Sequence, residues 1–67
     1  MADDSMPPVD PRILFGRLLL SRENLELTYS LTTREPRYAK ATRDLSSAIE
    51  SVYMALTAIS EEMRHAD

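Results

Sequence analysis

The chain has 67 residues, of which 43% are apolar and 28% charged, with one glycine, no cysteine and a net charge of −3. A chain this short buries little apolar surface by itself, and without cysteine no disulfide can reinforce it. A single histidine disfavours a structural zinc site, and the negative charge disfavours nucleic acid as a partner. The composition therefore predicts one small helical unit that gains stability by associating with itself or with another protein.

Residues 1–9 are predicted to form a flexible arm, because they combine two aspartates with two prolines and few large apolar groups. The same residues lack the charged and then apolar pattern of a secretion signal. The longest aliphatic run in the chain, residues 18–20, is far too short to span a bilayer. We therefore expect a cytoplasmic protein without a membrane segment.

A first helix is predicted over residues 11–31. Asp10 is placed to cap its exposed backbone N–H groups, and Pro11 suits the first helical position. When successive residues are projected 100° apart, the apolar residues fall on two stripes. A helix in a lone hairpin needs only one apolar face, so the second stripe predicts a second packing partner. The first stripe contains Leu14, Leu18, Leu25 and Tyr29, and the second contains Ile13, Leu20, Leu27 and Leu31.

A turn is predicted over residues 32–36, because Pro36 disfavours helical geometry at Glu35 and suits the start of a new helix. The second helix is predicted over residues 37–65, from apolar residues that advance by 4, 3, 4, 3 and 4 positions. Residues 10–67 are therefore predicted to form an all-α, antiparallel hairpin of two helices. The seam of the second helix contains Leu45, Ile49, Val52, Leu56, Ile59 and Met63.

If the chain turns back near Thr33, the second helix continues about three turns beyond the start of the first. That overhang leaves Ile59 and Met63 uncovered, and an exposed apolar surface of this kind predicts a contact. We expect a second copy to cover it, giving a homodimer with a four-helix bundle. The same register predicts three ion pairs between the helices: Arg17 with Glu50, Glu23 with Arg43, and Glu26 with Lys40. The expected self-association interface contains Leu20, Leu27, Val52, Leu56, Ile59 and Met63.

No motif predicts catalysis: a phosphate loop, HExxH, a calcium loop and GxSxG are all absent from the sequence. The serines of the second helix have no histidine or lysine placed to activate them. His65 lies beside Glu61 and Glu62 near the end of a helix, where a solvated surface is the ordinary interpretation. We therefore expect no enzymatic activity, no metal and no cofactor.

The residues around the turn are the one local excess of positive charge. They are interpreted as a cluster neutralised by Glu23 and Glu26, as a patch for an acidic protein, or as a nucleic-acid contact in which Tyr38 stacks on a base. Tyr53 and Met54 are residue types that protein interfaces favour. The candidate partner-binding residues are Arg34, Arg37, Tyr38, Lys40, Tyr53 and Met54.

The sequence offers helix faces and no reaction chemistry, so we expect a small protein–protein interaction module that regulates or adapts a larger protein. One alternative is a structural subunit of a larger helical assembly. Another, with weaker support, is a helical bundle that binds nucleic acid, or an anion through Arg17 and Arg22.

Overall fold

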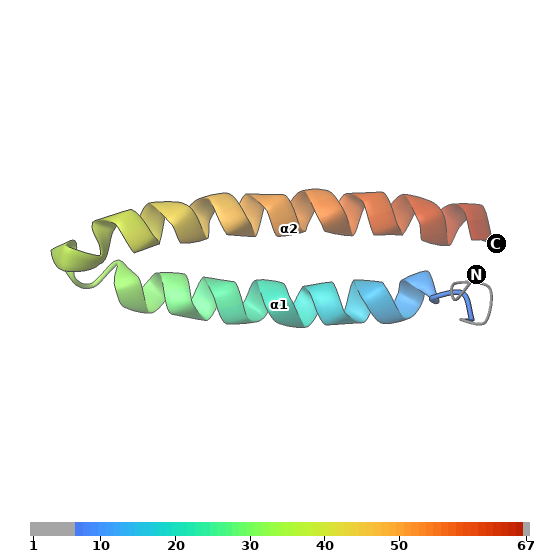
Figure 1. Ribbon diagram of the computed structural model, residues 1–67, viewed down its shortest axis with the longest axis horizontal. Coiled ribbons are helices and arrows are strands. Elements are labelled where there is room, and N and C mark those ends of the chain that lie inside the picture. Colours follow the sequence, from blue (N-terminus) through green and yellow to red (C-terminus); the bar gives the residue numbers. More distant parts are fainter. Residues whose placement is uncertain (1–6, 67) are drawn as a thin grey trace, which may run out of the picture.

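The structure is a computed structural model that describes residues 7–66 of the chain. It contains two long helices, α1 (Pro11–Thr32) and α2 (Ala39–Ala66), with a short 3-10 helix, η2 (Pro36–Tyr38), between them. The long helices lie side by side and antiparallel (Figure 1), which confirms the predicted all-α hairpin. Most of the predicted N-terminal arm, residues 1–6, lies outside the described residues.

The start of α1 is capped by its own neighbouring residues. The Asp10 carboxylate accepts a hydrogen bond from the backbone N–H of Arg12 at 2.9 Å, and Pro11 occupies a first-turn position where no N–H is needed. The Arg12 guanidinium also binds this carboxylate, with Nη2 at 3.1 Å from Oδ2. These hydrogen bonds, from the side chain first and the backbone second, lower the pKa of Asp10.

One face of each helix forms the interface between them. On α1, residues of the first predicted stripe such as Leu18, Leu25 and Tyr29 are half-buried. On α2, Leu56 is 7% exposed and is the one buried apolar side chain in the described part of the chain. The other seam residues of α2, including Val52, are half-buried. Two helices form a single interface with no further layer to close over it, which explains the small interior.

The turn is wider than the sequence predicted. The backbone N–H groups of Thr33, Arg34 and Glu35 donate hydrogen bonds to carbonyl groups in the last turn of α1. Glu35 is then extended, with φ −128° and ψ 123°, as expected for a residue before proline. Pro36 begins η2, which adds one more turn before α2. The chain therefore reverses over 33–38 and not over 32–36.

The wider turn shifts the register of the two helices. The Thr42 hydroxyl on α2 donates a hydrogen bond to the Thr32 hydroxyl on α1 at 2.9 Å. Farther along, the Arg22 guanidinium carbon lies 5.4 Å from the centroid of the Tyr53 ring. These pairs place the midpoint of the hairpin near residue 37. The predicted midpoint near Thr33 is therefore wrong.

The predicted overhang of α2 disappears with this shift. Pro11 is now level with the last turns of α2, and the two helices end close together on the side away from the turn (Figure 1). Ile59 and Met63, which the sequence left uncovered, are half-buried within the single chain. The predicted overhang was wrong because the position of the turn sets which residues of the two helices lie opposite each other. An error in that position shifts every such pairing by the same number of residues.

The predicted ion pairs between the helices are also wrong, for the same reason. All five ion pairs among residues 7–65 join residues no more than four positions apart, and none joins α1 to α2. Three of them join residues three or four positions apart, which face each other on one helix, and two join residues two positions apart at the start of a helix. The pairs are Asp10 with Arg12, Arg22 with Glu26, Glu35 with Arg37, Lys40 with Asp44, and Glu61 with Arg64.

Candidate protein-interaction surface

The second apolar stripe of α1 is mostly exposed to solvent. Ile13, Leu20, Leu27 and Leu31 expose 61%, 63%, 66% and 58% of their surface. Two exposed polar residues stand between them along the same line of the helix. A continuous apolar stripe of this length on a soluble helix is a typical contact surface. We call this surface the α1 ridge, and it consists of Ile13, Arg17, Leu20, Asn24, Leu27 and Leu31.

The expected self-association residues divide into two groups in the structure. Leu20 and Leu27 lie on the α1 ridge, where most of each side chain is exposed. The other four lie on the face of α2 that packs against α1, so the hairpin itself covers much of their surface. That second group contains Val52, Leu56, Ile59 and Met63.

Two shallow depressions flank the α1 ridge. The first is lined by Arg17, Leu20, Ser21 and Asn24. The second lies beside Leu27 and is also lined by Glu23, Glu26 and Ser30. One side of the ridge is therefore basic and polar, and the other side is acidic.

Tyr53 takes part in a polar cluster that joins the two helices. Its hydroxyl donates a hydrogen bond to Glu26 Oε2 at 3.3 Å, and its ring packs under the Arg22 guanidinium. Arg22 Nε lies 4.0 Å from Glu26 Oε1, and this buried nitrogen has no hydrogen-bond partner in the structure. The Arg22 side chain therefore packs between the two helices, which disfavours a role for it in binding an anion. Sequence reasoning missed this cluster because the predicted register kept its residues apart.

The partner-binding candidates near the turn are exposed and partly neutralised. Arg37 Nε lies 2.8 Å from Glu35 Oε1, and the guanidinium stacks 4.8 Å from the centroid of the Tyr38 ring. Lys40 Nζ lies 2.9 Å from Asp44 Oδ2, a hydrogen bond that raises the pKa of Lys40. The expected neutralisation by Glu23 and Glu26 is therefore wrong, because local acidic residues take that role. We call this surface the basic turn, and it consists of Arg34, Arg37, Tyr38, Lys40 and Arg43.

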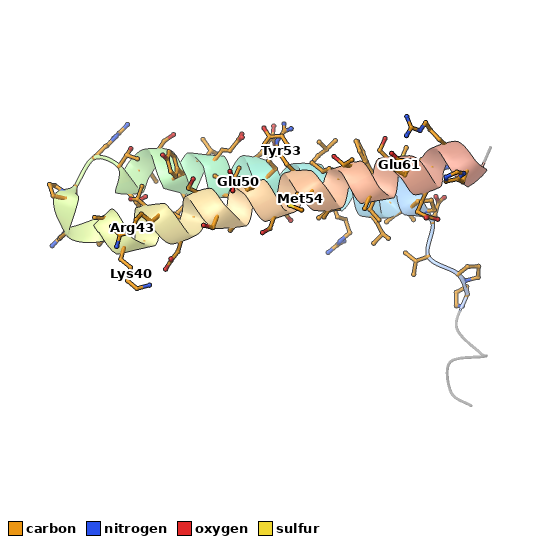
Figure 2. All side chains as sticks on the ribbon, turned by 90° about the horizontal axis from the view of Figure 1, so that it is seen from above. Lys40, Arg43, Glu50, Tyr53, Met54 and Glu61 are labelled. Atoms are coloured by element: carbon orange, nitrogen blue, oxygen red, sulfur yellow. The ribbon has the colours of Figure 1, made fainter. Side chains whose placement is uncertain are left out.

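The side chains of α2 that face outward are mostly polar. Figure 2 shows Lys40 and Arg43 near the turn, with Met54 midway along the helix and Tyr53 at its edge. Met54 is 73% exposed, the largest exposed fraction among the large apolar side chains of the described residues. Its neighbours on that side, such as Glu50 and Glu61, are charged, so it does not extend into an apolar patch.

The described residues contain no group of three or more histidine, aspartate or glutamate side chains that could hold a metal ion. Neither α1 nor α2 is long and apolar enough to cross a membrane. No known family, curated protein or solved structure matches this chain. Its function must therefore be inferred from its own surfaces.

Proposed function

We propose that this chain is a non-enzymatic protein-interaction module that regulates or adapts a larger protein. The observation that carries the proposal is the α1 ridge, an apolar stripe that follows one helix from Ile13 to Leu31 and stays mostly exposed within the part of the chain that the structure describes. Ridges with this spacing are the usual means by which one helix recognises another.

We also propose that the chain forms a homodimer with four helices. The support is the small interior of the hairpin, in which Leu56 is the one buried apolar side chain among the described residues. Chains of this size without disulfides or metals commonly gain the missing stability by oligomerisation. A cytoplasmic location remains a prediction from the sequence.

The basic turn is the surface we propose for the larger partner. Residues 34–44 contain four basic and two acidic side chains, in a chain whose net charge is −3. Arg34 and Arg43 form no ion pair with any residue between 7 and 65. An acidic protein surface would complement this charge and would be steered towards it during association.

Affinity capture with the chain as bait tests the proposal. The baits are the wild-type chain, Leu27→Glu on the α1 ridge, Arg37→Glu on the basic turn, and Ser47→Glu as a control at an exposed position of α2. We expect one protein to be retained by the wild type and the control and lost with Arg37→Glu, while circular dichroism shows unchanged helicity. Loss with Leu27→Glu as well would show that capture also requires the α1 ridge, either directly or through the pairing of two copies. Equal retention by all four baits, or by none, would contradict the proposal.

A structural subunit of a larger helical assembly is the second candidate, favoured by the same small interior. Such a subunit should lose helicity or polymerise when it is isolated. Circular dichroism and sedimentation over a dilution series separate the two functions, because a defined species that stays helical argues against a purely structural role.

A further inference from the structure

We propose that the α1 ridge of one chain packs against the α1 ridge of a second copy, with the two helices antiparallel about a two-fold axis near residue 22. This inference rests on the proposed self-association and specifies its geometry. The six ridge positions advance by 4, 3, 4, 3 and 4 residues along α1. Two helices pack side by side through this spacing, because it keeps one line of side chains facing the partner.

The α1 ridge lies on the side of α1 that faces away from α2. The residues of α1 that are half-buried against α2, such as Phe15, Arg22 and Tyr29, project about half a helical turn away from the ridge. From Ile13 to Leu31 the ridge extends for about 27 Å at 1.5 Å per residue. A second helix can therefore lie along its whole length without meeting α2.

Antiparallel pairing brings every ridge position opposite another ridge position. With the axis near residue 22, Ile13 of one copy meets Leu31 of the other, Leu20 meets Asn24, and Arg17 meets Leu27. Each polar ridge residue therefore packs beside a leucine and not beside its own copy. The two Arg17 residues are separated by about 15 Å along the helix axis.

Parallel pairing would be much less favourable. It would place the two Arg17 side chains in the same layer, where two guanidinium groups would lose water against each other. Because the ridge has Arg17 towards one end and leucines towards the other, only the antiparallel orientation avoids this contact while it still buries all four apolar positions.

The charges beside the α1 ridge do not select this orientation. A two-fold axis across the helices places the acidic flank of one copy, lined by Glu23 and Glu26, beside the acidic flank of the other. Arg17 lies on the opposite flank, so the two Glu23 side chains approach each other at the exposed edge of the interface, where like charges cost little. The choice of orientation therefore rests on the separation of the two Arg17 side chains within the ridge.

The predicted dimer is flat. Because the α1 ridge faces away from α2, the two copies of α1 lie in the centre and the two copies of α2 lie outside, in the order α2, α1, α1, α2. The four helices therefore form a single layer, and not the square arrangement expected for a four-helix bundle.

Single-cysteine variants test this register, because the natural chain contains no cysteine. In the antiparallel pair, position 20 of one copy is level with position 24 of the other, within the Cα separation of about 4.4–6.8 Å that a disulfide spans. In a glutathione redox buffer, we expect Leu20→Cys and Asn24→Cys to give little covalent dimer separately and a covalent dimer when mixed. A mixture of Leu20→Cys with Ser47→Cys is the control and should give little.

Covalent dimers formed by each ridge variant alone, without enrichment on mixing, would indicate parallel helices and overturn the proposal. Sedimentation equilibrium provides a second measurement without cysteine: Leu27→Glu should weaken dimerisation by about tenfold or more, and Ser47→Glu should leave it unchanged. A wild-type chain that sediments as a monomer would reject self-pairing. If that monomer still captured a protein in a manner sensitive to Leu27→Glu, the protein-interaction function would stand.

Discussion

Replacement of Gly16 by alanine is expected to stabilise the hairpin. Gly16 is exposed inside α1, and its φ is not positive. Apart from the adjacent backbone of α1, a Cβ built at this position meets no atom of the described residues within 4 Å. The new methyl group therefore clashes with none of the residues that the structure describes. Glycine loses more backbone freedom than alanine when a helix forms, so the expected gain is about 1 kcal/mol in the free energy of unfolding.

Thermal and urea denaturation followed by circular dichroism would measure this gain. For a domain of this size, 1 kcal/mol corresponds to a rise of about 4–8 °C in Tm. The slope of the unfolding free energy against urea concentration should not change, because the variant exposes nearly the same surface area when it unfolds. Ser47→Ala at an exposed position of α2 is the matched control, with a smaller expected gain of about 0.5 kcal/mol.

A gain no larger than that of Ser47→Ala, or a loss, would refute this reasoning. It would show that another group already lies against Gly16 in solution. Gly16 precedes Arg17, a residue of the α1 ridge, so self-association could affect the result. The denaturation should therefore be measured at a concentration at which the chain is monomeric. A gain that shrinks as the concentration rises would place a second helix at this position.

Three further variants test the hairpin. Leu56→Ala should lower the free energy of unfolding by about 2–4 kcal/mol, because it leaves a cavity at the one buried apolar side chain among the described residues. A loss below about 1 kcal/mol in urea denaturation would contradict the observed packing between the helices. Asp10→Ala should destabilise the chain at neutral pH. Because the pKa of Asp10 is lowered in the folded state, the difference in Tm between the wild type and this variant should shrink as the pH falls through that pKa. A difference in Tm that does not change with pH would argue against a cap by the ionised carboxylate. Tyr53→Phe should cost less than about 1 kcal/mol, since its hydrogen bond to Glu26 is long and exposed, and a larger loss in urea would show a stronger cluster.

Local sequence patterns predicted the helices well. The cap at Asp10 and the first-turn position of Pro11 depend on neighbours within two residues, and the start of α1 follows from them. Pro36 correctly separated the helices for a similar reason, because it restricts Glu35 directly. Features that depend on a few adjacent residues can be read from a sequence without knowledge of the tertiary structure.

The register could not be predicted in the same way. It depends on how many residues the reversal consumes, and η2 together with the backbone hydrogen bonds after Thr32 consumes more than the proline alone suggests. An apolar seam with helical spacing fits the other helix in more than one register, because the same pattern of apolar residues recurs along the helix. Tyr53 is a candidate partner residue because of its residue type, and only the true register shows that its hydroxyl also reaches Glu26 on α1.

The sequence predicted the part of the candidate surface that lies on α1 but not the part that it placed on α2. The two stripes of α1 follow from its periodicity alone, so the exposure of Leu20 and Leu27 could be expected from the sequence. The sequence also placed Ile59 and Met63 in the same surface, because the wrong register left them uncovered. Their position inside the hairpin becomes evident only once the turn has its true length.

The short range of the ion pairs has a consequence for the order in which this chain folds. Each pair joins residues of one helix or of the segment next to it, so it can form before the helices meet. Contacts between the helices can then close from the turn outwards, beginning with Thr32 and Thr42, and each closure shortens the loop that the next one must form. Added salt should screen the charges within each helix while it leaves the order of closure unchanged.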